Sequence, residues 1–274
     1  NFSDYGSDHI LLARLATFET GGIGNNVFEL ISSIGIARTT GRQLIVTSET
    51  YKFFKIRHPE LVHLLNGVYP ENERTVRAAF RIDKSKGDCC RYYGEISNEI
   101  KKKSLQPWLS ARLNYLQSYL YFSNVTRREI SARLELSSKA QAAIDAELAE
   151  MRQLRDAEHI ICVHSRRGDY FTSGLHKPSN SEFLLGATDF VHMNSNTKST
   201  LILLIGDDLI WQREMAEKLQ ETGKYAMVLP RLQSVSSPVT DWHVSRKFCD
   251  TVILTASSST FGWWLAYLSK GQKV

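Results

Sequence analysis

Two adjacent arginines, Arg166 and Arg167, stand directly after an apolar run at residues 159–163. A short β-branched run that ends in a polar loop with a glycine is typical of a buried parallel strand, which delivers side chains to the carboxyl edge of its sheet. The guanidinium group stays charged and bonds phosphate through two nitrogens at once. Residues 164–170 therefore predict an anion site, although two solvated arginines on a surface loop would give the same pattern.

A second group that could hold an anion lies near the end of the sequence. Three serines and a threonine at residues 257–260 precede a very apolar segment that begins at Phe261. Hydroxyls and unpaired backbone N–H groups at the start of a helix form a cradle for phosphate, and Ser259 and Thr260 are the candidates here. Simple N-capping of a buried helix explains the same residues. Because a strand-like run at 251–254 comes just before, we expect this cradle at the same sheet edge as the arginines.

Two acidic residues, Asp207 and Asp208, follow a third apolar run at residues 201–205. Their carboxylates could accept hydrogen bonds from a ribose or from guanine N–H groups, and Asp208 is our candidate for this role. An N-cap role at the next helix explains them at least as well. They do not form the Asp-x-Asp pattern of metal-dependent glycosyl transfer, and no His/Cys/Asp cluster has the spacing of a metal site. We therefore expect no metal and no other cofactor.

The N-terminal part contains a glycine loop between an apolar run and a helical pattern. Gly22, Gly24 and Asn25 stand in this loop, and a second apolar run at 43–46 completes a β-α-β unit. Glycines let backbone N–H groups approach a ligand at the start of the helix. As a dinucleotide fingerprint the loop is incomplete, because the third glycine position is occupied by Val27. A tight turn needed only for packing remains the alternative.

The order of the apolar runs predicts two α/β domains. We expect an N-terminal domain at residues 1–155 and a C-terminal domain at 156–274, with a boundary near Asp156 after a long helix at 137–155. The aromatic spacing over residues 108–122 predicts a core-facing helix or, as the alternative, a wall that stacks on sugars. Residues 50–105 read as irregular, with short helical pieces around 59–65 and a strand at 79–82. In the second half we expect helices at 181–193, 209–221, 238–248 and from 261, and strands at 201–205, 226–229 and 251–254.

The composition is that of a folded protein with an anionic small-molecule ligand. The chain has 274 residues, 42% of them hydrophobic, and a formal net charge of +5. Its basic residues are scattered apart from a run at 101–103, which argues against nucleic acid. The pairing of the four cysteines and the compartment stay open. Sequons at Asn1 and Asn124 are weak indications of a secretory lumen. Since the sequence lacks an initiator Met, we interpret it as a fragment.

Four blocks, read together, resemble the α1,2-fucosyltransferase family. They are Gly-Gly-Ile-Gly-Asn at 21–25, Leu-Gln-Ser-Tyr-Leu-Tyr-Phe at 116–122, His-Ser-Arg-Arg-Gly-Asp-Tyr at 164–170 and Ser-Ser-Ser-Thr-Phe-Gly-Trp-Trp at 257–264. The resemblance implies a GT-B-like architecture of two facing Rossmann-type domains, with GDP-fucose bound mainly by the C-terminal one. It also implies transfer without metal, inversion at fucose C1, a galactose-terminated glycan acceptor, and a type II Golgi membrane protein whose anchor lies outside this sequence. The family usually has Gln where Asn26 stands.

Roles for individual residues follow from this resemblance and from the charge that moves. Negative charge grows on the β-phosphate as the sugar becomes cationic, so fixed cations stabilise the transition state. We expect Arg166 as the main pyrophosphate contact, together with Arg167, Ser259, Thr260 and the helix start at Phe261. His164 supports the loop or the nucleotide. Asp169 is the candidate base, or else an aspartate that orients Arg166.

Two other functions remain compatible with the sequence. One is another GDP-fucose transferase, directed to protein hydroxyls or to chitooligosaccharides, because such enzymes share the arginine loop. The other is a non-catalytic glycan-binding or nucleotide-sugar-binding homologue, since a fold does not determine a function. The acceptor and the oligomeric state cannot be predicted from these residues.

Overall fold

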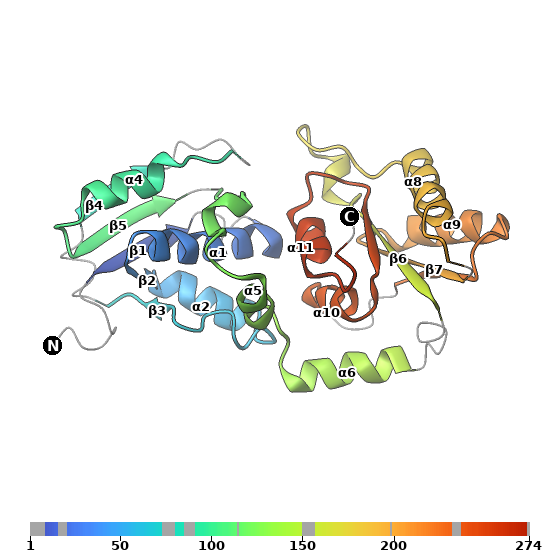
Figure 1. Cartoon of the computed structure of the whole chain (residues 1–274), viewed down its shortest axis with the longest axis horizontal. Coiled ribbons are helices and arrows are strands. Elements are labelled where there is room, and N and C mark those ends of the chain that lie inside the picture. Colours follow the sequence, from blue (N-terminus) through green and yellow to red (C-terminus); the bar gives the residue numbers. More distant parts are fainter. Residues whose placement is uncertain are drawn as a thin grey trace. The chain divides into compact units, whose positions relative to one another are not determined.

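A computed structural model describes residues 9–15, 21–72, 80–84, 91–113, 115–149, 157–197, 199–231 and 237–272 (Figure 1). The chain divides into two compact units, Asn1–Ser137 and Ser138–Val274. This division precedes the boundary expected near Asp156, because helix α6 (Ser138–Ala149) contacts α10 (Val239–Phe248) of the second unit. The expectation of two α/β domains is confirmed, and each unit is described by itself below.

The first unit contains a five-stranded sheet with the order β3-β2-β1-β5-β4 and parallel pairing throughout. The predicted β-α-β unit is confirmed as β1, α1 and β2, and the strand predicted at 79–82 is β4. The strands are β1 (Ile10–Leu15), β2 (Gln43–Val46), β3 (Tyr69–Pro70), β4 (Phe80–Lys84) and β5 (Trp108–Leu113). The helices are α1 (Ile23–Thr39), α2 (Ser48–Arg57), α4 (Glu95–Lys102), α5 (Arg127–Arg133) and the 3-10 turn η2 (Tyr119–Phe122).

The helix predicted over residues 108–122 was wrong. This stretch forms β5, which lies between β1 and β4, and then the short turn η2. Trp108 lies in β5, whereas Tyr119 and Phe122 lie in η2, so aromatics from two separate elements imitated one helical stripe. The irregular reading of residues 50–105 was also wrong in part, because this segment contains most of α2 and all of α4.

The second unit contains a four-stranded parallel sheet with the order β8-β7-β6-β9. The chain therefore builds β7 and β8 on one side of β6 and then returns to add β9 on the other side. The carboxyl end of β6 lies at the point where the strand order reverses, which is where open α/β sheets bind ligands. The strands are β6 (His159–Ser165), β7 (Thr200–Gly206), β8 (Met227–Pro230) and β9 (Thr251–Leu254).

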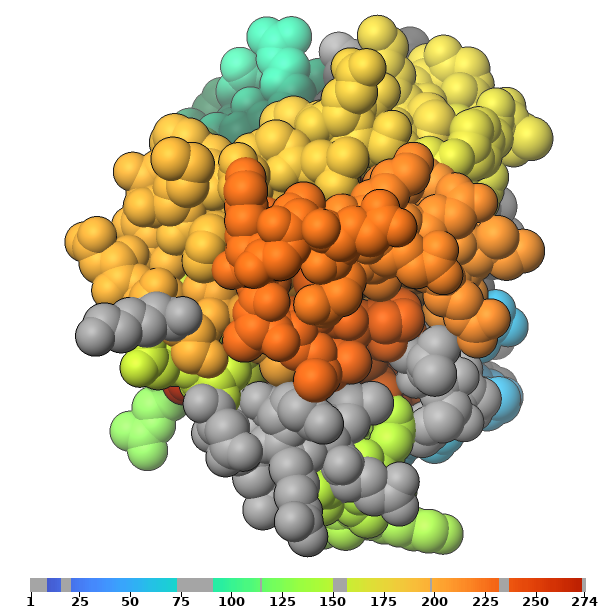
Figure 2. Space-filling model, turned by 90° about the vertical axis from the view of Figure 1, so that its right-hand side faces the viewer, coloured from blue at the N-terminus to red at the C-terminus, as the bar shows by residue number. Residues whose placement is uncertain are grey.

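Helices connect these strands as the sequence predicted. They are α8 (Ser181–Met193), α9 (Leu209–Glu221), α10 (Val239–Phe248) and α11 (Thr260–Leu268). Helices α8 and α9 lie side by side on one surface of the unit (Figure 2) and cover an apolar cluster that includes Leu184, Trp211 and Met215. The buried strands and the apolar faces of these helices thus form one core that holds the loops at the carboxyl edge in place.

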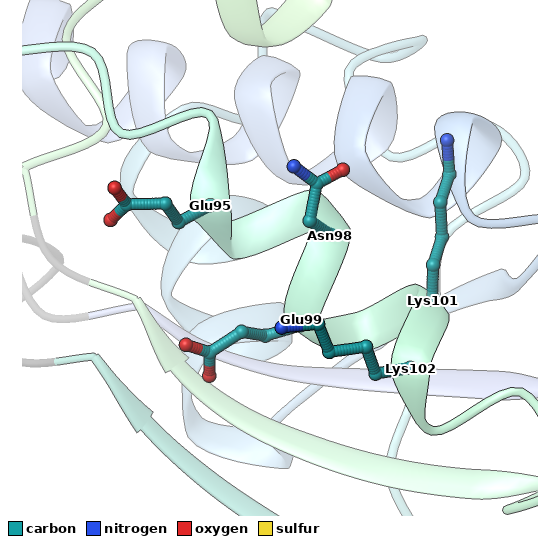
Figure 3. A pocket seen from close by; sticks show the side chains of 5 residues that line it. All are labelled: Glu95, Asn98, Glu99, Lys101 and Lys102. Atoms are coloured by element: carbon teal, nitrogen blue, oxygen red, sulfur yellow. The ribbon is translucent and has the colours of Figure 1, made fainter.

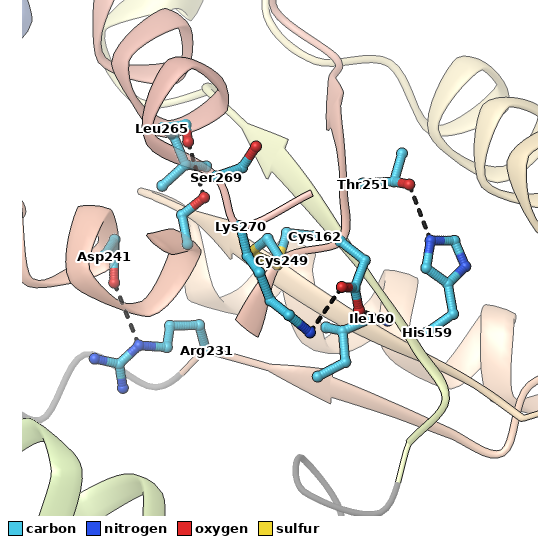
Figure 4. The surroundings of a disulfide bond; sticks show 12 residues. His159, Ile160, Cys162, Arg231, Asp241, Cys249, Thr251, Leu265, Ser269 and Lys270 are labelled. Carbon is cyan, nitrogen blue, oxygen red and sulfur yellow. Dashed lines mark hydrogen bonds and ion pairs between the residues drawn. A yellow bond between two sulfur atoms is a disulfide. The ribbon is translucent and has the colours of Figure 1, made fainter. Parts of the chain in front are cut away.

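A disulfide between Cys162 and Cys249 joins β6 to the end of α10 (Figure 4). The two Cα atoms are 5.5 Å apart, and both side chains are fully buried. The sequence left the cysteine pairing open. The parallel pairing of β6 with β9 decides it, because Cys249 ends the helix that leads into β9.

Candidate functional site

The arginine loop, residues 166–180, leaves the carboxyl end of β6 and is anchored on its return. The backbone N–H of Arg166 donates to Ser179 Oγ at 2.9 Å, and the backbone N–H of Ser179 donates to the Arg166 carbonyl at 3.0 Å. Thr255, just after β9, donates its hydroxyl proton to Ser179 Oγ at 2.7 Å. These bonds fix the loop between two neighbouring strand ends, as the prediction of a site at this edge requires.

The guanidinium group of Arg166 is bound by carboxylates through its Nε atom. Its Nε donates to Asp169 Oδ1 at 2.8 Å and lies 3.3 Å from Asp207 Oδ2, while its Nη1 and Nη2 form no hydrogen bond within the described part of the chain. Partial burial opposes the charge, but the hydrogen bond to Asp169 and the charge of Asp207 outweigh it and raise the pKa of Arg166. The two terminal nitrogens remain able to bind an anion in the forked geometry that phosphate prefers.

Arg167 has a different environment, in which two guanidinium nitrogens are hydrogen-bonded and the group lies against two aromatic rings. Its Nη1 donates to the Ser179 carbonyl at 2.7 Å, and its Nε donates to Asp208 Oδ2 at 3.2 Å. The same group lies 4.4 Å from the centre of the Trp211 ring and 4.6 Å from that of Phe171. This packing is that of an arginine which holds the loop in shape. The geometry thus distinguishes the two arginines, of which the family resemblance put Arg166 first.

The two aspartates after β7 also stabilise the loop. Asp207 accepts hydrogen bonds from the backbone N–H groups of Arg167 at 2.8 Å and Gly168 at 3.1 Å. Asp208 caps α9 by accepting from the Trp211 N–H at 3.0 Å, which is the N-cap alternative. Sequence reasoning missed the role of Asp207. The signal was present, since acidic and basic loops follow adjacent parallel strands and must meet at one edge.

Asp169 is the most exposed carboxylate of this group, with 62% of its side chain accessible. It begins the turn η3 (Asp169–Phe171), and its carboxylate forms an ion pair with Arg166. This contact is what the orienting alternative expects. An exposed carboxylate beside an anion site is also accessible to a hydroxyl of a second substrate, so its role as a base stays a prediction.

His164 and Ser259 are buried beneath the loops. The His164 ring is 1% exposed, its centre lies 5.8 Å from that of Phe261, and Nδ1 lacks a partner in the described structure. Burial, with a smaller contribution from the charge of Arg166, lowers the pKa of His164 to about 3. Ser259 Oγ caps α11 by accepting from the Gly262 N–H at 3.2 Å. His164 is therefore a neutral support, and Ser259 has the N-cap role that the sequence left open.

The remaining predicted residues divide between the two units. Thr260 opens α11 and Phe261 follows it in the second unit, at the same sheet edge as Arg166. Gly22 precedes α1 as its N-cap without a side-chain hydrogen bond, and Gly24 and Asn25 lie in the first turn of that helix. The structure thus brings together the predicted residues of the second unit, and it describes the glycine loop separately within the first unit.

Two further features bear on where a ligand could bind. A surface hollow in the first unit lies along the exposed side of α4 and is lined by acidic and basic residues together with Asn98 (Figure 3). Its lining comes from one short helix and includes none of the predicted site residues. Among the residues that the structure describes, no three His, Cys, Asp or Glu side chains are grouped to hold a metal ion. Metal-free binding stays a prediction.

The known proteins to which this chain is similar are glycosyltransferases. Residues 92–274 match the family model described as glycosyl transferase family 11. A galactoside 2-alpha-L-fucosyltransferase from Caenorhabditis elegans is 29% identical over 283 residues, which cover 95% of this chain and 68% of that protein. A crystal structure of POFUT1 in complex with GDP aligns with a TM-score of 0.60 at 15% identity, over 97% of both chains.

A second solved structure has the same fold. The alpha-1,6-fucosyltransferase NodZ soaked with GDP-fucose aligns with a TM-score of 0.51 at 17% identity, over 95% of this chain and 93% of the other. At these identities the two structures establish the fold alone. The fold is the GT-B-like α/β architecture that the sequence predicted.

Proposed function

The chain belongs to glycosyl transferase family 11, and we propose that it is an inverting fucosyltransferase that moves L-fucose from GDP-fucose to the 2-hydroxyl of a galactoside. The name of its nematode relative supports the reaction and the acceptor class. The observation that carries the proposal is the state of Arg166. It is fixed through Nε, and its two terminal nitrogens are unpartnered in the described structure at the sheet edge where α/β proteins bind nucleotides.

The chemistry follows from where charge develops. The bond between fucose C1 and the β-phosphate oxygen lengthens, the sugar becomes oxocarbenium-like, and the departing GDP gains negative charge. Arg166 stabilises that charge through its terminal nitrogens, and because Asp169 and Asp207 already orient it, little reorganisation is needed during the reaction. The start of α11 adds the positive end of a helix dipole at the same edge.

The acceptor hydroxyl attacks C1 from the face opposite the leaving phosphate, which inverts the configuration. A base that removes the hydroxyl proton accelerates such a step by about 10²–10⁴-fold. Asp169 is the carboxylate that we propose for this role. Its exposure fits contact with a second substrate, whereas its ion pair with Arg166 already engages Oδ1, so we assign the larger share of the acceleration to leaving-group stabilisation.

We also propose that the protein acts in the Golgi lumen as part of a membrane-anchored chain. The Cys162–Cys249 disulfide supports an oxidising compartment, because such bonds persist mainly in secretory compartments. The described helices include none that is long and apolar enough to cross a bilayer. The membrane anchor is proposed from the family resemblance alone.

The direct test uses the full-length protein with labelled GDP-fucose and a panel of β-galactosides. We expect a product that an α1,2-specific fucosidase removes, and we expect GDP binding by calorimetry to persist in excess EDTA. Labelled product on peptide hydroxyls or on chitooligosaccharides alone would replace the acceptor assignment. Binding of GDP without transfer to any acceptor would indicate a non-catalytic homologue, and loss of GDP binding in EDTA would contradict the metal-free mechanism.

A further inference from the structure

A histidine in the returning half of the arginine loop, His176, contacts the serine block after β9. Its Nδ1 lies 3.1 Å from Ser258 Oγ, and its ring stacks on Tyr170 with the centres 4.7 Å apart and the planes 18° from parallel. The backbone N–H of His176 donates to Ser173 Oγ at 3.1 Å, which fixes the backbone from which the side chain extends. The imidazole is therefore held from three directions.

The arginine loop is linked to the segment after β9 at its base and again further out, where Ser258 contacts both His176 and Tyr170. The first link joins Thr255 to the buried Ser179 and holds the base of the loop. The link from His176 to Ser258 lies further out, where Ser258 is exposed and His176 is half-buried. An outer link of this kind faces the solvent side of the site, where a ligand would arrive.

Ser258 differs from its neighbour Ser259 in how its hydroxyl is used. Ser259 is buried and caps α11, whereas Ser258 is exposed, lies 3.1 Å from His176 Nδ1 and donates to the Tyr170 hydroxyl over 3.5 Å. A hydroxyl has one proton to donate. If Ser258 donates it to His176, the hydroxyl presents only lone pairs to an anion. If His176 Nδ1 carries the hydrogen and donates to Ser258, the serine proton is held only by the long 3.5 Å bond to the Tyr170 hydroxyl and can turn from it to a phosphate oxygen.

We propose that His176 is a positioning residue for fucosyl transfer, which donates from Nδ1 to Ser258 Oγ and so directs the serine hydroxyl toward a phosphate oxygen of GDP-fucose. This inference rests on the proposed function. Tyr170 supports the arrangement because its ring packs against His176 and also lies 5.9 Å from the Arg166 guanidinium carbon. Tyr170 thereby connects the two groups that would contact the pyrophosphate, because Arg166 lies over its ring and Ser258 bonds its hydroxyl.

The test compares two substitutions at His176 that separate stacking from hydrogen bonding. His176→Phe keeps a ring on Tyr170 and removes the donor, whereas His176→Asn places an amide N–H near the position of Nδ1. We expect kcat/KM for GDP-fucose to fall about tenfold in the Phe variant, as for one hydrogen bond to a charged group, and to recover to within about threefold in the Asn variant. The KM for the acceptor should stay unchanged in both.

A double-mutant cycle with Ser258→Ala tests whether His176 acts through Ser258. If it does, His176→Phe causes no further loss once Ser258 is alanine. A full tenfold loss in the alanine background would overturn the proposal. So would equal activity of the Phe variant and the wild type, or a loss of activity that follows the loss of thermal stability in both variants.

The second unit offers a matched control in His192. Its Nδ1 lies 3.0 Å from the hydroxyl of Thr200, and its ring packs edge-on against Tyr225, but this group stands at the start of β7. His192→Phe therefore removes a similar bond at the opposite sheet edge, and GDP-fucose kinetics should not change. Wild-type GDP binding is measured first. If the wild type fails to bind GDP, the proposed function fails as well. If the wild type binds GDP and the His176→Phe variant has unchanged kinetics, only the role of His176 is overturned.

Discussion

At the scale of residues, the site depends on how two neighbouring arginines differ in their partners. Arg167 is enclosed by Ser179, Asp208 and two aromatic rings, while the hydrogen bond of Arg166 to the protein comes from Nε. An arginine whose donors are partly bonded and enclosed offers fewer of them to a ligand. Arg166 is therefore the residue on which activity should depend most, and Arg167 the one on which the loop depends.

Arg166→Lys should lower kcat by about 10²–10³-fold while the Kd for GDP changes little, because lysine keeps the charge but loses the fork that meets the developing phosphate charge. Steady-state kinetics and calorimetry measure the two quantities. Arg167→Lys is the comparison, and we expect it to lower the melting temperature more than kcat. A raised KM with unchanged kcat in Arg166→Lys would make that residue a ground-state anchor.

Asp169→Asn should reduce kcat less than Arg166→Ala does, since an amide oxygen can still accept the hydrogen bond from Arg166 Nε. We expect a loss of less than about tenfold for Asn, against the 10²–10⁴-fold that removal of a required base typically costs. Turnover at saturating concentrations of both substrates decides this. If the Asn variant is the more impaired of the two, Asp169 is the base.

Burial of His164 should make stability depend on pH. Its pKa is about 3 in the folded protein and about 6.5 when unfolded, so between these values only the unfolded chain takes up the proton. The contribution is complete above about pH 6.5 and is lost as the pH falls toward 3. Burial of His58, which lowers its pKa, adds in the same direction.

Urea unfolding from pH 7.5 to pH 5 measures this dependence. The free energy of unfolding should fall less steeply with decreasing pH in His164→Gln, which removes the titrating ring. The difference in slope from the wild type should be up to about 1.4 kcal/mol per pH unit. Identical slopes for the variant and the wild type would contradict the assignment to His164.

At the scale of elements, α11 packs so closely on β6 that one position excludes any side chain. A Cβ atom built on Gly262 would lie 2.7 Å from Nδ1 of His164, which is itself enclosed. The start of α11 and the arginine loop after β6 are thus positioned by direct contact between α11 and β6. This explains why an apolar helix with a glycine in its first turn lies at the site.

Gly262→Ala should destabilise the protein by about 1–3 kcal/mol, since the added methyl group overpacks a closed contact. Gly186→Ala in α8 is a matched control, because a methyl group added there would have nothing within 4 Å and alanine favours helix by up to about 1 kcal/mol. Thermal denaturation should therefore move in opposite directions for the two variants. A stable Gly262→Ala protein would show that His164 can shift.

At the scale of the whole molecule, each unit has its own parallel sheet, and the predicted donor residues of the second unit lie within one of them. Its stability includes a covalent link that spans 87 residues, from Cys162 to Cys249. Such a link restricts the unfolded chain, and the loss of entropy for a loop of this length is equivalent to about 4–5 kcal/mol.

Removal of this disulfide by Cys162→Ala together with Cys249→Ala should lower the unfolding midpoint of the second unit and weaken GDP binding in parallel. Reductant should have the same effect on the wild type and no added effect on the double variant. A variant with Cys89→Ala and Cys90→Ala serves as the control and should remain sensitive to reductant. Unchanged melting of the Cys162/Cys249 variant would contradict a stabilising role.

The sequence by itself determined where the strands of the second unit end and which loops follow them. Buried parallel strands need short β-branched runs, and polar loops must interrupt them, so β6, β7 and β9 and the arginine, aspartate and serine loops could be located from residue order alone. Parallel pairing then required these loops to share an edge. The α/β class, the two domains and the helices of the second unit followed from the same pattern.

Only the tertiary structure decided the contacts between residues that are distant in sequence. Asp207 lies about 40 positions from the loop that it stabilises, and Ser179 closes on Arg166 only once β9 supplies Thr255. Local pattern could not tell which arginine these groups enclose, nor distinguish the central strand β5 from a helix, because both depend on burial from two sides. The pairing of Cys162 with Cys249 was undetermined for the same reason, since it is set by which strands become neighbours.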